Sequence, residues 1–174
     1  MTIYDSVTDA GARAGAIASI DHFQADGAVA ETAVPVGVVV VRGTAATQCK
    51  VPASDAETQK PLGVSKLNLT RITEAYSIGE ALDIVRDGEI YVVCEDAIAH
   101  GDTVYVRHTA NGAGKLVLGA IRSDADSGNA SVALGITPVE TTTGAGVCKC
   151  RVFLPCNAPL LADLLARIVV LETP

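Results

Sequence analysis

From residue 34 onward, the chain consists of short runs rich in valine, isoleucine and other β-forming residues, separated by glycine, proline, asparagine or aspartate. Such punctuation is typical of antiparallel strands folded into a sandwich or a barrel. No long helical segments alternate with these runs, which argues against a parallel α/β fold. The sequence therefore predicts an all-β fold, a compact β-barrel or sandwich of short antiparallel strands. The expected strands are residues 37–42, 47–51, 62–67, 81–86, 89–94, 103–107, 115–121, 131–136 and 147–154.

Two turns are expected inside the acidic stretch from Ala81 to Arg107. Asp87-Gly88 separates two β-rich runs, and Asp-Gly is a favoured two-residue hairpin loop. Pairing the chain about this loop places Val85 opposite Ile90, an aliphatic cross-strand pair that stabilises antiparallel sheet. A second turn is expected at residues 100–102. Turn chemistry thus accounts for these glycines and acids, with a loop-borne functional site as the alternative.

The composition divides the chain into an N-terminal arm (1–33), a β-rich body (34–156) and an apolar C-terminal tail (157–174). The arm is rich in alanine and glycine, with a partly helical stretch expected around residues 12–20. The tail has a helical apolar stripe, although a strand at 167–171 is also compatible with it. We expect the arm to lie on a neighbouring subunit or partner, and the tail to cap the barrel or contact another subunit. The predicted interface residues are Tyr4, Ile17, Ile20, Phe23, Leu160, Leu164 and Ile168.

Charge and cysteine content narrow the possible partners. The formal net charge is −7, with 20 acidic and 13 basic residues and no basic cluster, so nucleic acid is not an expected partner. The apolar runs are too short to cross a bilayer, so no membrane contact is predicted either. Five cysteines, an odd number, indicate reduced thiols made in a cytoplasm. Cys148 and Cys150 share one face of a predicted strand, which favours core packing over metal binding.

No catalytic, metal or cofactor-binding residues are predicted. The three histidines, His22, His100 and His108, fall in the arm, a turn and a strand end, outside any recognisable triad. Glycines near residues 43 and 111–115 do not continue as a phosphate-binding loop. Residues 124–129 begin like a calcium loop but have Asn129 where such a loop needs glycine, and a surface turn explains them. The sequence therefore predicts a protein that is not an enzyme.

The order of segments resembles that of the capsid cement (decoration) proteins of tailed bacteriophages. The segments that carry the resemblance are "VPVGVVVVRG" (34–43), "KPLGVSK" (60–66), "YSIGEALDIVRDGEIYVV" (76–93), "GDTVYVR" (101–107) and "CRVFLP" (150–155). The resemblance covers residues 1–155 and leaves out the tail. It implies a β-rich body, often a homotrimer, that is made in the host cytoplasm, sits on the outer capsid surface and locks neighbouring major capsid proteins together.

Three other functions remain open at this point, the least favoured being an enzyme of unrecognised type, because the histidines are scattered. A barrel of this kind can hold a small apolar ligand, although the chain has few aromatic residues to line such a pocket. A receptor-binding or tail-associated virion protein is closer in class to a cement protein. Only its position on the particle would distinguish such a protein from a cement protein.

Overall fold

The computed structural model describes residues 12–20, 22–70, 74–111 and 115–154. Within these ranges the chain is almost entirely β-structure, with a short helix, α1 (Asp55–Thr58), and a 3-10 turn, η2 (Asp126–Gly128). The predicted all-β fold is confirmed. The strands are β1 (Gln24–Ala30), β2 (Val34–Pro35), β3 (Val39–Arg42), β4 (Gln48–Lys50), β5 (Pro61–Ser65), β6 (Ala75–Tyr76), β7 (Ala81–Cys94), β8 (Tyr105–Arg107), β9 (Ile121–Arg122), β10 (Ala130–Val132), β11 (Ile136–Pro138) and β12 (Gly146–Phe153).

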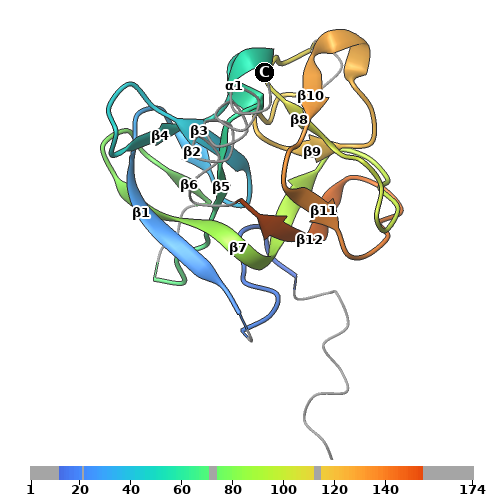
Figure 1. Cartoon of the computed structure of the whole chain (residues 1–174), viewed down its shortest axis with the longest axis horizontal. Helices are drawn as coiled ribbons and strands as arrows, with labels where there is room; N and C mark the ends of the chain where they lie inside the picture. The colour runs from blue at the N-terminus through green and yellow to red at the C-terminus, as the bar shows by residue number, and fades with distance from the viewer. Residues whose placement is uncertain (1–11, 21, 71–73, 112–114, 155–174) are drawn as a thin grey trace, which may run out of the picture.

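Strand β7 is shared by two halves of the body. In the first half the strand order β1-β4-β3-β5-β7 closes on itself, because β1 also pairs with β7. In the second half β7 pairs with β12 and β9, which continue to β11, β8 and β10. Figure 1 shows β1 to β6 gathered on one side of β7 and β8 to β11 on the other. The first half is therefore a small closed barrel.

Each half has its own hydrophobic core, and both are built mainly from aliphatic side chains. The barrel core contains Ala30, Val34, Val36, Val38, Val40, Cys49, Leu67, Tyr76, Leu82 and Ile84. The second core contains Val39, Val64, Val85, Ile90, Val92, Cys94, Ile98, Val104, Val106, Ile121, Ala133, Ile136, Cys148, Cys150 and Val152. Because side chains alternate along a strand, Val38 and Val40 enter the barrel core while Val39 enters the second core.

The hairpin predicted at Asp87-Gly88 is wrong, because β7 runs through these residues without turning. Gly88 has φ +128°, and a Cβ there would lie 2.7 Å from the Cβ of Phe23. The register of β1 against β7 also shifts here, between Gln24 and Ala25. A glycine inside a strand often marks an irregularity or a close backbone approach, and this Asp-Gly marks both. Val85 and Ile90 therefore lie along one strand rather than opposite each other.

The N-terminal segment from residue 15 to residue 30 lies along one edge of β7. Ala18 N–H donates to the Glu89 carbonyl (2.8 Å), and Ile17 forms an antiparallel bridge with Ile90. Further along the chain, β1 pairs antiparallel with β7. The helix expected around residues 12–20 is absent from the described part of that stretch. Residues 24–30 of the predicted arm thus form a strand that the sequence reasoning missed.

Most other strand predictions agree with the structure to within a few residues. The exceptions lie beyond β8. Of the predicted strand 115–121, the described residues form a strand only from Ile121, in β9. The predicted strand 131–136 is divided into β10 and β11 by a turn at Gly135, where φ is +70°. The C-terminal tail lies outside the described residues.

Candidate functional site

The three histidines lie apart in the fold. His22 Nε2 lies 2.9 Å from an Asp87 carboxylate oxygen at the surface. His100 is exposed in a turn, and His108 is buried with its Nδ1 2.9 Å from Thr109 Oγ1. Within the described residues, no group of three or more histidine, cysteine or acidic side chains is placed to hold a metal ion. No helix in these ranges has the length and hydropathy needed to span a membrane.

The described cysteines are core residues. Cys49, Cys94, Cys148 and Cys150 are buried free thiols. Burial raises the pKa of Cys49 to about 11. Cys148 and Cys150 face the same core as Val152, as their spacing predicts. Cys156 lies outside the described residues.

A buried ion cluster, formed by Glu95, Arg107, Arg122 and Asp126, lies beside the second core. The Arg107 side chain is 0% exposed, and its Nε donates to both carboxylate oxygens of Glu95 (2.7 and 2.8 Å). Its Nη2 donates to Asp126 (2.7 Å), while Arg122 Nη1 donates to Glu95 (3.2 Å). Charge-assisted hydrogen bonds of this kind are among the stronger ones in proteins. The cluster therefore ties the loops around β8 and β9 to the end of β7.

The ion cluster also explains the segment that begins like a calcium loop. The Arg107 guanidinium holds the pKa of Asp126 below its usual value. The backbone N–H of Asp126 donates to Asp124 (2.8 Å) and lowers the pKa of that carboxyl too. Arg122 Nη2 also contacts Asp124, at 2.7 Å. Asp124 and Asp126, the carboxylates that suggested a cation site, are thus paired with arginine side chains. This pairing agrees with the structural turn that the sequence predicts.

Several exposed apolar side chains come from segments that meet at Asp87 and Gly88. Phe153 is paired with Asp87 in the register of β12 against β7, and Phe23 lies next to Gly88. The N–H of Phe153 donates to the carbonyl of Gly135, the residue that follows Leu134. Large exposed apolar patches often mark interaction sites. Ile20 lies two residues after Ala18, whose N–H donates to the Glu89 carbonyl. We call this region the Asp87 surface, and its exposed apolar residues are Ile20 (86% exposed), Phe23 (42%), Leu134 (45%) and Phe153 (62%).

The predicted interface residues divide into three groups. Ile20 and Phe23 are exposed, as an interface requires. Ile17 packs against the second core of its own chain, because it lies beside Ile90 on β7. Because Ile17 is only partly buried there, its predicted contact with a partner stays a prediction. Tyr4, Leu160, Leu164 and Ile168 lie outside the described residues. Sequence reasoning did not identify Leu134 and Phe153, since single apolar residues in strands also occur in cores.

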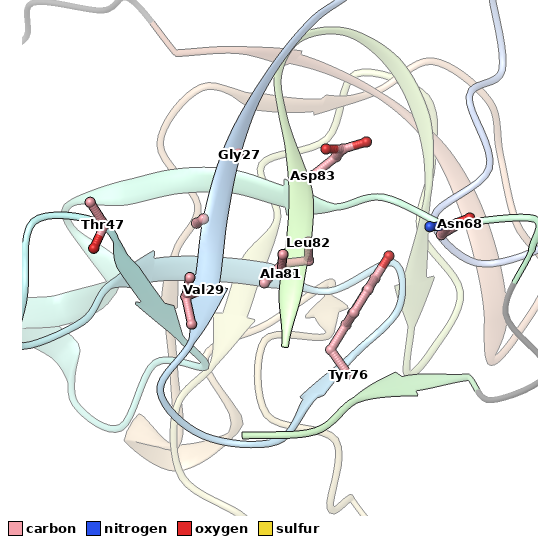
Figure 2. Close-up of a pocket in the computed structure, with 9 residues that line it drawn as sticks. Gly27, Val29, Thr47, Asn68, Tyr76, Ala81, Leu82 and Asp83 are labelled. Carbon is pink, nitrogen blue, oxygen red and sulfur yellow. The ribbon is translucent and has the colours of Figure 1, made fainter. Parts of the chain in front are cut away.

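Two cavities are lined by β1 near Gly27, and both also include Thr47. The first, about 420 Å³, is lined by residues of β1 and β7 together with Thr47, Asn68 and Tyr76. Figure 2 shows β1 and β7 side by side at this point, with Thr47 on one side and Asn68 and Tyr76 on the other. The second cavity, about 100 Å³, lies between β1 and the β3–β4 turn. Both are surface features, since the barrel interior is filled by side chains such as Val34 and Val38, each 0% exposed.

The described residues thus form a two-core β body with several exposed apolar side chains. The comparison with protein families identifies the kind of protein to which this body belongs. The family model described as "Structural cement protein (E217 gp24/Pam3 gp6)" matches residues 4–152. The chain therefore belongs to this family of phage structural cement proteins, as the order of its segments suggests. Membership implies association with capsid proteins and a place in the virion.

One solved phage structure supports this fold, and a second gives a lower score. A chain from the capsid of Myoviridae phage XM1 superposes with a TM-score of 0.64 at 19% identity, covering 88% of this chain and 98% of that chain. A chain from the head fiber gp8.5 N base of bacteriophage phi29 gives a TM-score of 0.46 at 12% identity, covering 75% of this chain and 94% of that one. No curated protein sequence matches the chain.

Proposed function

We propose that this protein binds the outer surface of a phage head and links neighbouring major capsid proteins, in a structural rather than a catalytic role. The observation that carries the proposal is the exposure of Ile20, 86%, in a chain of the cement family. An isoleucine this exposed gains stabilisation when a partner covers it, about 1.5–3 kcal/mol for full burial. The Asp87 surface is therefore the part of the described body proposed to face the shell.

Residues at both ends of the chain complete the proposed contact. Tyr4, Leu160, Leu164 and Ile168 are proposed to add apolar area to the Asp87 surface, as their sequence pattern predicts. Because cement proteins bind at symmetry-related positions, one modest contact recurs around a ring, and linked binding makes the total affinity large.

Replacing Ile20 with serine is expected to weaken binding to undecorated shells by about tenfold, the equivalent of about 1.4 kcal/mol of lost apolar contact. Leu69→Ser is the matched control, because Leu69 is 83% exposed but lies in the loop after β5. Binding would be measured by cosedimentation over a concentration series, with circular dichroism to verify folding. Equal affinities for the two variants would exclude Ile20 from the contact.

We also propose that the protein acts as a homotrimer. A trimer presents its shell-binding surface three times around a closed ring, which matches a three-fold position on the lattice. Native mass spectrometry at low micromolar concentration is expected to give the mass of a ligand-free trimer. A monomer that assembles into trimers only on shells would require the proposal to be restricted to the bound state. A monomer carrying a reproducible extra mass would instead favour the small-ligand barrel.

A further inference from the structure

The pairing between β1 and β4, which helps to close the barrel, is short. β1 pairs with β4 at Val29 and Ala30, whereas β1 itself begins at Gln24. Its pairing with β7 extends along the whole strand. Within the described residues, the outer edge of β1 from residue 24 to residue 28 therefore has no neighbouring strand.

Two hydrogen bonds establish which backbone groups point toward this open edge. Ala30 N–H donates to the Glu80 carbonyl beside β7 (2.9 Å), and Val29 N–H donates away from β7 to the Thr47 carbonyl (2.9 Å). Backbone groups alternate in direction along a strand that pairs in this way. The N–H and C=O groups of Ala25 and Gly27 thus point away from β7, toward the open edge.

Open space surrounds β1 near Gly27, above its face and beside its outer edge. A Cβ placed on Gly27 would have nothing within 4 Å. Gly27 and Ala28 line both the cavity of about 420 Å³ and the cavity of about 100 Å³. Figure 2 shows Gly27 on β1, with Thr47 on one side and the β7 strand on the other. Unpaired strand edges are sites at which extended peptides add by main-chain hydrogen bonding.

We propose that an extended segment of the major capsid protein adds to β1 as a further strand at Ala25–Gly27. The inference rests on the proposed function, since it specifies how the shell protein is held. Side chains of the added strand alternate between its two faces, so every second residue is expected to approach the larger cavity. This contact is made by β1 and is additional to the contact proposed for the apolar Asp87 surface.

Charge favours the shell protein over a second copy of this chain. Antiparallel pairing that joins Ala25 and Gly27 of two copies places Asp26 directly opposite Asp26. Like charges at that position are destabilising, although the ion pair of each Asp26 with Arg86 (2.6 Å) reduces the effect. Among the described residues lining the larger cavity, the only charged one is Asp83. The Asp83 side chain is 58% exposed and lies 3.0 Å from Lys66 Nζ. The remaining lone pairs of its carboxylate can accept hydrogen bonds from a further basic side chain. The added segment is thus expected to carry a lysine or arginine on that face.

Hydrogen exchange measured residue by residue tests this pairing. In the free protein, the amides of Ala25 and Gly27 are expected to exchange fast, and those of Asp26 and Ala28 slowly, because the latter face β7. On binding to undecorated shells, Ala25 and Gly27 are expected to become protected. Fast exchange of both amides in shell-bound protein would overturn the proposal. If the amides of Ala25 and Gly27 are already protected in the free protein at high concentration, the edge of β1 pairs with a second copy of this chain instead.

Gly27→Pro and Gly27→Ala form a matched pair for the same test. Proline removes the outward N–H and is tolerated in edge strands at such positions, whereas alanine keeps the N–H and enters open space. Gly27→Pro is expected to weaken shell binding by about tenfold relative to Gly27→Ala. Equal binding by folded variants would contradict strand addition while leaving the cement role intact. If the wild-type protein itself does not bind shells, the proposed function fails, and this inference fails with it.

Discussion

Replacing Arg107 with methionine is expected to lower the free energy of unfolding by about 3–5 kcal/mol, the usual cost of removing one partner from a buried ion pair. Arg107 is 0% exposed and supplies two hydrogen bonds to Glu95 and one to Asp126. Methionine can occupy much of the same volume but donates no hydrogen bond. Glu95 would then keep Arg122 as its arginine partner, at 3.2 Å.

Arg151→Met provides the matched control for this prediction. Arg151 contacts Glu89 at 3.2 Å, but its side chain is 63% exposed, so its loss is expected to cost at most about 1 kcal/mol. Urea unfolding would compare the midpoints of both variants with that of the wild-type protein. If Arg107→Met unfolds at the same urea concentration as Arg151→Met, the ion cluster does not stabilise the fold. A change in the slope of the transition would instead indicate an altered unfolded or native state.

The ion cluster illustrates what sequence reasoning could not reach. Glu95, Arg107 and Asp126 are dispersed along the chain, and each is an unremarkable charged residue in its local segment. Only the pairing of β8 with β9, and of β7 with β9, brings them together. The chemistry of residues 124–129 could be predicted as a structural turn, and Arg122 is close in sequence, but Arg107 reaches Asp126 only through non-local strand pairing.

The strands themselves were largely predictable, because short β-rich runs and turn residues are local features. The errors occur where tertiary packing changes the meaning of a local pattern. Asp87-Gly88 has the composition of a hairpin loop, yet Gly88 lies within β7 because Phe23 packs beside it. Gln24–Ala30 has Val29 as its only β-branched residue, and it forms a strand because its backbone pairs with the edge of β7. The exposed position of Ile20 was predictable from its segment, whereas the burial of Ile17 depends on Ile90.

Replacing Gly15 with alanine is expected to cause the second large loss of stability, because the N-terminal segment packs tightly against the barrel. Gly15 has φ +71°, a conformation that costs an L-residue about 1–2 kcal/mol. A Cβ there would also lie 2.7 Å from Leu67 N and 2.8 Å from Ser65 O. Both are backbone atoms in hydrogen bonds, Leu67 N with Gly15 O and Ser65 O with Gly37 N. Relieving this crowding is expected to cost a further amount of about 1–3 kcal/mol.

Gly79→Ala separates the two contributions, since Gly79 has φ +82° but a Cβ there would have nothing within 4 Å. It is expected to show only the conformational cost, so the difference between the two variants in urea or thermal unfolding measures the crowding at Gly15. A difference near zero would mean that the segment around Gly15 moves freely and can act as a detachable arm. A large difference would mean that it belongs to the folded body, in which case a truncation extending to residue 25 would remove part of the second core, including Ile17. Loss of shell binding by such a truncation would then report unfolding as well as loss of the contact, and the single substitution of Ile20 is the better probe of the shell interface.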